Sequence, residues 1–185
     1  AKKTNSFEDF AAAARALIAH GWTTPGNITI HGGSAGGVLV GATVNLAPEL
    51  FRAAIAEVPF VDVLTTMLDD TLPLTPPEWP EWGNPIESAT DYATIKAYAP
   101  YENIREIDYP HILATGGLTD PRVTYWEPAK WVARLRAQRT DDGLTLLRTE
   151  MTAGHGGKAG RFNQLHEVAF VYAFVIFVHT FLKEK

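Results

Sequence analysis

The sequence of 185 residues contains no cysteine, which excludes disulfide bonds and metal sites with thiolate ligands. Its 16 Lys and Arg residues are outnumbered by 21 Asp and Glu, and they form no long basic run. This balance argues against a nucleic-acid partner bound through phosphate contacts. The longest apolar stretch, residues 168–182, is interrupted by His179 and Thr180 and falls short of the ~20 residues that a membrane helix needs. We therefore expect a buried core helix there and no membrane partner.

The first residues, Ala1-Lys2-Lys3, include neither an initiator Met nor an apolar signal region. We therefore expect the chain to be a fragment of a longer protein. Its lack of cysteine leaves the redox compartment open, and we favour a cytoplasmic location. With 46% hydrophobic residues, it is long enough for one domain with a sizeable core.

Short apolar segments alternate with segments of helical periodicity along the chain. We predict strands at residues 27–31, 53–58, 111–115 and 144–148, and helices at residues 7–18, 38–46, 129–139 and 162–182. Asn5 or Ser6 would cap the first helix, and Gly21 would stop it. Residues 72–100 contain six prolines, which predict a long irregular loop or cap. The alternation predicts an α/β fold, with a mostly parallel sheet covered by helices on both faces.

The segment Gly32-Gly33-Ser34-Ala35-Gly36 lies between the first predicted strand and the following helix. G-x-S-x-G in that position is typical of a nucleophile elbow, in which the serine occupies a sharp, strained turn. We expect a larger side chain at either Gly32 or Gly36 to clash with the neighbouring strand or helix. The alternative is a chance glycine-rich turn, since the chain has 15 glycines.

A nucleophilic serine needs a base and a carboxylate, and both follow later in the chain. Asp120 comes directly after the strand predicted at 111–115, and His155 lies in a loop between glycines. The order Ser34, Asp120, His155 is the order found in α/β-hydrolases. Asp120 could instead be a turn former before proline, and three other acids compete with it, namely Asp62, Asp69 and Asp70.

An oxyanion hole normally takes one backbone N–H from the residue after the nucleophile, here Ala35, and a second donor from elsewhere. No second donor is evident in the sequence. No cofactor or metal is needed for chemistry of this kind.

With these residues assembled, the sequence resembles the C-terminal catalytic portion of the prolyl oligopeptidase family of serine peptidases, and most of all its oligopeptidase B branch. The matching segments are GGSAGG at 32–37, VPFVDVLTTM at 58–67, EWGNP at 81–85, GLTDPRV at 117–123 and GHGGK at 154–158. The segment at 58–67 carries no visible chemistry, so sharing it points to common ancestry more specifically than the elbow does.

The resemblance implies that residues 1–185 form the C-terminal part of an α/β-hydrolase domain, without the family's N-terminal β-propeller and first hydrolase strands. It implies a cytoplasmic endopeptidase that cleaves short peptides after Lys or Arg, with Ser34, Asp120 and His155 as its catalytic residues. It also implies that Glu78 binds the basic side chain of the substrate and that Arg122 anchors the peptide backbone.

The sequence departs from the family's pattern in two places. Pro80 stands where oligopeptidase B has the second acid of a pair, and the neighbouring Glu81 is a possible substitute. The tyrosine that supplies the family's second oxyanion donor precedes the start of this chain. Glu78 as a solvated loop acid and Arg122 as a structural partner of a carboxylate stay open as alternatives, as do a carboxylesterase of the same fold and a non-catalytic fragment.

Overall fold

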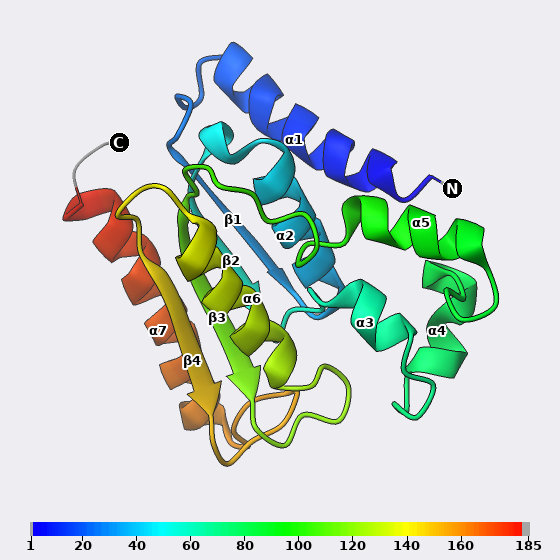
Figure 1. The fold of residues 1–185 in the computed structure, drawn as a ribbon. Helices are drawn as coiled ribbons and strands as arrows, with labels where there is room; N and C mark the ends of the chain where they lie inside the picture. The colour runs from blue at the N-terminus through cyan, green and yellow to red at the C-terminus, as the bar shows by residue number, and fades with distance from the viewer. Residues whose placement is uncertain (1, 183–185) are drawn as a thin grey trace.

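The structure is a computed structural model that describes residues 2–182. Its sheet has four parallel strands in the order β1 (Ile28–Gly33), β2 (Phe51–Glu57), β3 (His111–Gly117) and β4 (Thr145–Glu150) (Figure 1). All of the predicted strands are confirmed, with small shifts at their ends. Because the strands are parallel, the loops that leave β1, β2, β3 and β4 all begin at the same edge of the sheet.

Helices cover both faces of the sheet, which confirms the predicted fold class (Figure 1). Ala54 and Ile112 point to one face, where they share a core with Trp131 of α6 (Trp126–Gln138) and with residues of α2 (Ala35–Leu46). Ile55 and Leu113 point to the other face, where they pack against α7 (Arg161–Thr180). Neighbouring strand residues thus face opposite cores, and β2 and β3 are apolar at nearly every position.

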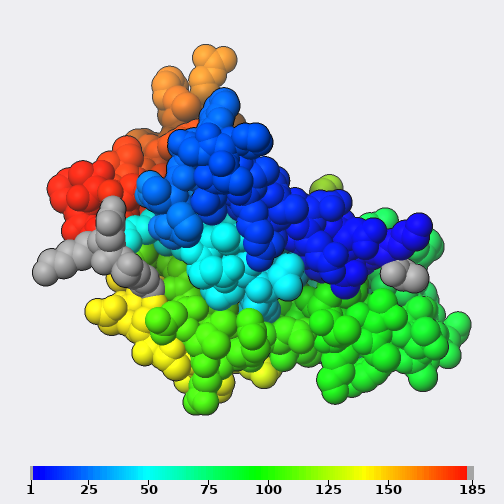
Figure 2. Space-filling model, turned by 90° about the horizontal axis from the view of Figure 1, so that it is seen from above, coloured from blue at the N-terminus to red at the C-terminus, as the bar shows by residue number. Residues whose placement is uncertain are grey.

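The helix α1 (Thr4–Ala19) begins earlier than predicted, and neither Asn5 nor Ser6 caps it. Its N-cap position is Lys3, which makes no side-chain capping bond. The predicted stop is confirmed, because Gly21 takes a positive φ of 72° just after the helix. Figure 2 shows α1 along the outside of the molecule beside α2.

The prediction of an irregular segment at residues 72–100 is wrong, because it contains α4 (Thr75–Trp82) and α5 (Ala89–Tyr98). Both follow α3 (Val63–Met67) and lie at one end of the sheet (Figure 1). Prolines are tolerated in the first turn of α4 because the N–H groups of that turn have no partner within the helix. The Ser88 hydroxyl caps α5 by accepting from the backbone N–H of Asp91 at 3.1 Å.

The prediction that the last helix is a buried core helix is also wrong. Only Val171, Phe174 and Val178 of α7 are buried, whereas the side chains of its outer face, such as Tyr172 and Ile176, are exposed. Within the described residues no further layer covers this face. By length and composition alone, α7 is apolar enough to cross a membrane, a property that a single helix packed on a soluble core can share.

Candidate active site

Ser34 lies on the tight turn between β1 and α2, with a φ of 54° and a ψ of −123°. A positive φ is uncommon outside glycine, and such strain is typical of functional turns. The Ser34 backbone N–H donates to the carbonyl of Glu57 at 2.9 Å, and its carbonyl accepts from the N–H groups of Gly37 at 2.8 Å and Phe60 at 3.0 Å. The strained turn is therefore held between the end of β2 and the start of α2.

The glycines around Ser34 differ in how much space they have. A Cβ at Gly32 would lie 2.6 Å from the carbonyl oxygen of Gly36, so the expected clash there is confirmed. A Cβ at Gly36 would meet no heavy atom within 4 Å, so the expected clash at this second position is wrong. The crowded position is the next residue, Gly37, where a Cβ would lie 2.4 Å from the Cβ of Pro59. The residue that crowds Gly37 lies in the turn after β2, so the five-residue motif around Ser34 could not have predicted this contact.

Asp120 and His155 lie on the loops that follow β3 and β4, at the same sheet edge as Ser34. The Nε2 atom of His155 is 3.0 Å from the Ser34 Oγ, and its Nδ1 atom is 2.7 Å from the Oδ2 atom of Asp120. The two loops can approach closely because Gly117 has no side chain. A Cβ at this position would lie 2.6 Å from the carbonyl oxygen of Gly154. The structure thus brings together the three residues predicted as nucleophile, base and acid.

Both oxygens of the Asp120 carboxylate have partners, and its side chain is fully buried. Oδ1 accepts from the backbone N–H groups of Arg122 at 2.8 Å and Val123 at 3.0 Å, while Oδ2 faces His155. A carboxylate at Nδ1 favours the tautomer with its proton on that nitrogen, which leaves the Nε2 lone pair facing the Ser34 hydroxyl. This arrangement can remove a proton from the serine as it attacks a carbonyl carbon.

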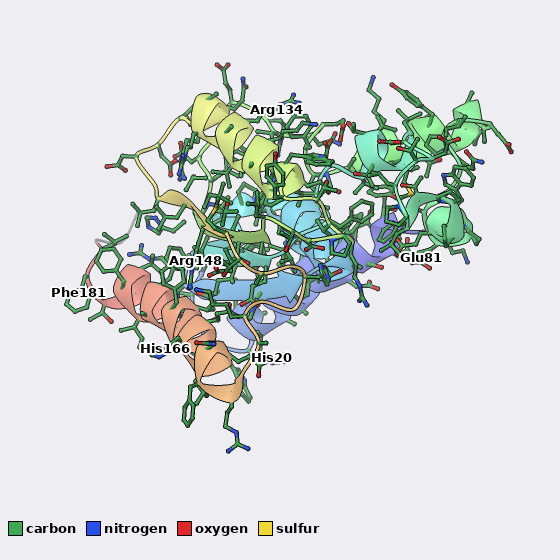
Figure 3. The ribbon with its side chains drawn as sticks, turned by 90° about the horizontal axis from the view of Figure 1, so that it is seen from below. His20, Glu81, Arg134, Arg148, His166 and Phe181 are labelled. Atoms are coloured by element: carbon green, nitrogen blue, oxygen red, sulfur yellow. The ribbon has the colours of Figure 1, made fainter. Side chains whose placement is uncertain are left out.

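The competing acids lie in other contacts. Asp62 is buried and forms an ion pair with Lys130. Asp69 accepts from the backbone N–H of Thr71 at 3.0 Å, and Asp70 is exposed. The other histidines are likewise elsewhere, and His20 and His166, labelled in Figure 3, are exposed on the surface.

Ala35 is the first residue of α2, so its N–H has no acceptor within the helix. The N-terminus of a helix also carries a partial positive charge, which stabilises a negative charge that develops next to it. Ala35 can therefore supply one backbone donor beside Ser34, as the sequence predicts.

A pocket of about 680 Å³ opens beside the elbow, between α2 and α4. Ala35 and Gly36 line one side of it, and Glu78, Glu81 and Trp82 line another. The Oε2 atom of Glu78 accepts from the indole N–H of Trp82 at 2.8 Å. Glu78 thus stands in a helix at the pocket wall rather than in a loop, and its carboxylate is partly buried against an aromatic side chain.

The same pocket already holds a positive charge from the chain itself. The ammonium of Lys3 lies 2.5 Å from an oxygen of Glu81 and 3.9 Å from the ring centre of Trp82. The hydrogen bond and charge of Lys3 lower the pKa of Glu81. Figure 3 labels Glu81, which lies on the opposite side of the molecule from Phe181 at the C-terminus of α7. The pocket wall therefore combines two carboxylates with an aromatic face, a set that suits a cation.

Arg122 is exposed, and its backbone N–H takes part in fixing Asp120. Within residues 2–182 its guanidinium forms no ion pair with a carboxylate, which does not favour the structural alternative. In that described part of the chain, no group of three or more His, Asp or Glu side chains is arranged to hold a metal ion.

Sequence reasoning missed Glu127, which is only 1% exposed although it carries a carboxyl group. Burial raises its pKa to about 7, although hydrogen bonds from its neighbours lower it. The signal was available, because Glu127 shares one helix face with the buried Trp131 and Leu135, four and eight residues later. The helix was predicted to begin at residue 129, two residues too late to include it.

Comparison with known proteins gives one consistent family. The model of the prolyl oligopeptidase family matches residues 1–179. Protease 2 of Moraxella lacunata is 55% identical over 174 residues, which cover 94% of this chain and 25% of that protein. Dipeptidyl aminopeptidase BI of Pseudoxanthomonas mexicana is 48% identical over 174 residues, 94% of this chain and 24% of that protein.

Solved structures give the same result. Oligopeptidase B of Leishmania major superposes with a TM-score of 0.93 at 47% identity, over 96% of this chain and 24% of that one. Oligopeptidase B of Trypanosoma brucei with covalently bound antipain gives 0.91 at 46% identity, over 96% of this chain and 25% of that one. The chain thus spans about a quarter of the length of the relatives it matches.

Proposed function

Because the chain belongs to the prolyl oligopeptidase family, we propose that it carries the catalytic centre of a serine oligopeptidase that cleaves short peptides after Lys or Arg. One observation carries the proposal: Ser34, His155 and Asp120 form a continuous chain of contacts of 3.0 and 2.7 Å at the edge where the parallel strands end.

In this mechanism the Ser34 Oγ attacks the carbonyl carbon of the scissile peptide, and His155 Nε2 takes the hydroxyl proton. The buried Asp120 stabilises the imidazolium that results. When the C–N bond breaks, His155 passes the proton to the leaving amine, and the substrate's acyl group remains as an ester on Ser34. A water molecule then repeats the sequence, giving a proton to His155 that returns to Ser34 as the ester is hydrolysed.

The Ala35 N–H is the proposed donor to the oxyanion that forms during attack. Arg122 is the proposed anchor of the peptide backbone, since its exposed guanidinium is available for a carbonyl oxygen. These roles are supported by the place of Ala35 at the start of α2 and by the exposure of Arg122 two residues after Asp120.

The preference for basic residues is proposed from the pocket between α2 and α4. Glu78 is close to the elbow, and the Lys3 ammonium between Glu81 and Trp82 supports the idea that this pocket accepts a cation. Glu81 would supply the second charge that Pro80 lacks. A substrate Lys or Arg side chain would then enter past Ala35 and Gly36.

The relatives are about four times longer than this chain, and we propose that the rest of such a protein completes the domain. Within the described residues β1 is an edge strand, and the outer face of α7 is apolar and exposed. Further hydrolase strands would pair with the β1 edge, other parts of the protein would cover the face of α7, and the N-terminal propeller would follow the family pattern. The second oxyanion donor would also come from that part.

A fluorophosphonate probe tests the proposal on the full-length protein, because it reacts covalently with an activated serine. We expect labelling of Ser34 alone, and none in Ser34→Ala. Ser88→Asn serves as the matched control and should label normally, because Ser88 lies outside the pocket beside the elbow and an Asn side chain can still cap α5. Labelling that survives Ser34→Ala would overturn the assignment.

Substrates separate the remaining alternatives. A peptidase of the proposed kind hydrolyses an N-terminally blocked Arg amide, whereas a carboxylesterase hydrolyses only short esters. A dipeptidyl aminopeptidase, as one relative is named, requires a free N-terminus two residues before the cleaved bond. No turnover of any of these by the full-length protein would favour a non-catalytic role.

A further inference from the structure

Glu127 holds a segment that the catalytic contacts do not include. Its Oε2 atom accepts from the backbone N–H groups of Val61 and Asp62, both at 3.0 Å, and its Oε1 atom accepts from the Thr66 hydroxyl at 2.7 Å. Burying a carboxyl group is costly unless its hydrogen-bonding capacity is used. Here α6 contributes such a group to fix the backbone that follows β2.

That backbone, residues 57–62, forms a turn that we call the 57–62 turn, and it wraps around Ser34. The Glu57 carbonyl accepts from the Ser34 N–H, and the Phe60 N–H donates to the Ser34 carbonyl. Pro59 lies against Gly37, in the first turn of α2. The position of Ser34 therefore depends on where this turn lies.

The 57–62 turn is strained at Val58, whose φ is 41°. Positive φ is a true outlier for a β-branched residue, and it persists only where surrounding contacts determine the conformation. On one side the Val58 N–H donates to the Thr115 carbonyl at 3.2 Å. On the other side the segment is held by Glu127 through Val61 and Asp62. Without Glu127, the turn could relax away from Ser34.

We propose that Glu127 is a positioning residue that keeps the strained 57–62 turn against Ser34 and so aims the serine at His155. The inference rests on the proposed role of Ser34 as nucleophile. Glu127 suits this task because α6 begins just after the loop of Asp120, whose Oδ1 atom binds the Val123 N–H. One helix thereby links the loop of the acid to the turn of the nucleophile.

The test measures the rate of fluorophosphonate labelling, kcat and KM in the full-length protein, for variants shown by circular dichroism to be folded. Glu127→Leu removes both acceptors, and we expect kcat and the labelling rate to fall about 10- to 100-fold with KM changed less than about threefold, because a small displacement of a reacting group is costly. Glu127→Gln should stay within about threefold of the original protein, because its amide oxygen can still accept from both backbone N–H groups and its NH₂ can donate to the Thr66 oxygen.

Thr66→Val is the matched control, because it removes a hydrogen bond to the same carboxylate without touching the 57–62 turn. We expect its labelling rate to change less than about twofold. A loss of labelling rate equal to that of Glu127→Leu would overturn the inference. It would show that any change around the buried carboxyl group, and not the loss of its bonds to the 57–62 turn, lowers the rate.

Val58→Gly supplies the decisive comparison, since glycine adopts a positive φ without strain. We expect Glu127→Leu combined with Val58→Gly to label at least threefold faster than Glu127→Leu alone. If Glu127→Leu does not fold, Glu127→Asp, whose shorter side chain cannot reach both N–H groups, takes its place in the same comparison. Normal labelling of the Glu127 variant, or no gain from Val58→Gly, would overturn the inference while leaving the proposed function intact. Absence of labelling in the unsubstituted protein would overturn both.

Discussion

The Nε2 atom of His155 lies 3.0 Å from the Oγ atom of Ser34, although 121 residues separate the two in the chain. Each residue follows a parallel strand, and such strands deliver their loops to one edge of the sheet. The contact is therefore a product of the fold, and it can be tested through its members.

Asp120→Asn and His155→Ala should each lower kcat by roughly 10³- to 10⁴-fold, because the imidazole can no longer act as a correctly oriented base. Asn keeps an oxygen for the N–H groups of Arg122 and Val123, but its NH₂ cannot accept from His155 Nδ1. The double variant should be little worse than His155→Ala, since these residues act as a unit. Steady-state kinetics of the full-length protein checks this, with Asp69→Asn as a control acid. Additive losses would argue against a shared function.

Glu78→Gln should lower kcat/KM for an Arg-containing substrate by about 10- to 100-fold, because a charge-assisted hydrogen bond is worth roughly 1.5 to 3 kcal/mol. Gln keeps an oxygen for the Trp82 indole, so the pocket should stay in place. Hydrolysis of a small uncharged ester serves as the internal control and should be nearly unchanged. Equal losses for both substrates would assign Glu78 to structure alone.

Lys3→Met should lower KM for a basic substrate by about two- to fivefold, because it frees Glu81 and the Trp82 ring from an internal cation whose exposed ion pair is weak. The matched control is Lys2→Met, at an exposed neighbour outside the pocket lining. The measurement is KM for a series of peptides that differ only in the residue before the cleaved bond, which is Arg, Lys or Leu. A similar gain with the Leu substrate would point to general opening of the pocket instead of released charge.

Gly37→Ala should destabilise the protein by about 1 to 3 kcal/mol, because the new methyl group would overlap Pro59 and push the turn after β2. Gly36→Ala is the control one residue earlier, where the same methyl group meets open space, and it should be neutral or slightly stabilising. Thermal unfolding of the two variants provides the comparison. Equal destabilisation at both positions would contradict the crowding that distinguishes Gly37 from Gly36.

Glu127 predicts how stability depends on pH. Its pKa of about 7 in the folded protein exceeds the ordinary value of 4.5, so the folded state holds the proton more tightly than the unfolded state. This contribution is fully present below pH 4.5 and is lost as pH rises through 7, amounting to about 3 kcal/mol at 1.36 kcal/mol for each pKa unit.

Glu127→Gln has no such titration, so its melting temperature relative to the original protein should increase between about pH 5 and pH 8. Two charged groups lie near the Glu127 carboxyl. The charge of Asp62 raises the pKa of Glu127, and Lys130 is paired with Asp62. Melting curves recorded across that range provide the measurement. A constant difference between the two proteins would show that Glu127 does not change its protonation in this window.

The local sequence around Ser34 was sufficient to predict the strand, the turn and the helix of the elbow. Alternating apolar segments and glycines carry that information because strand and helix formation depend on near neighbours. The order of Ser34, Asp120 and His155 further predicted which loops belong together, since parallel strands leave few ways to arrange them.

Other features were decided only by tertiary structure. Glu127 of α6 meets Val61 and Asp62, and Pro59 crowds Gly37 of α2, because the segment after β2 packs against two helices that are distant from it in the sequence. The outer face of α7 is exposed because no described element lies over it, although its composition alone indicated a buried helix. The sequence determines which side chains are apolar and therefore favour burial. The packing of elements that are distant in the chain decides which of these side chains are covered and which buried polar groups are hydrogen-bonded.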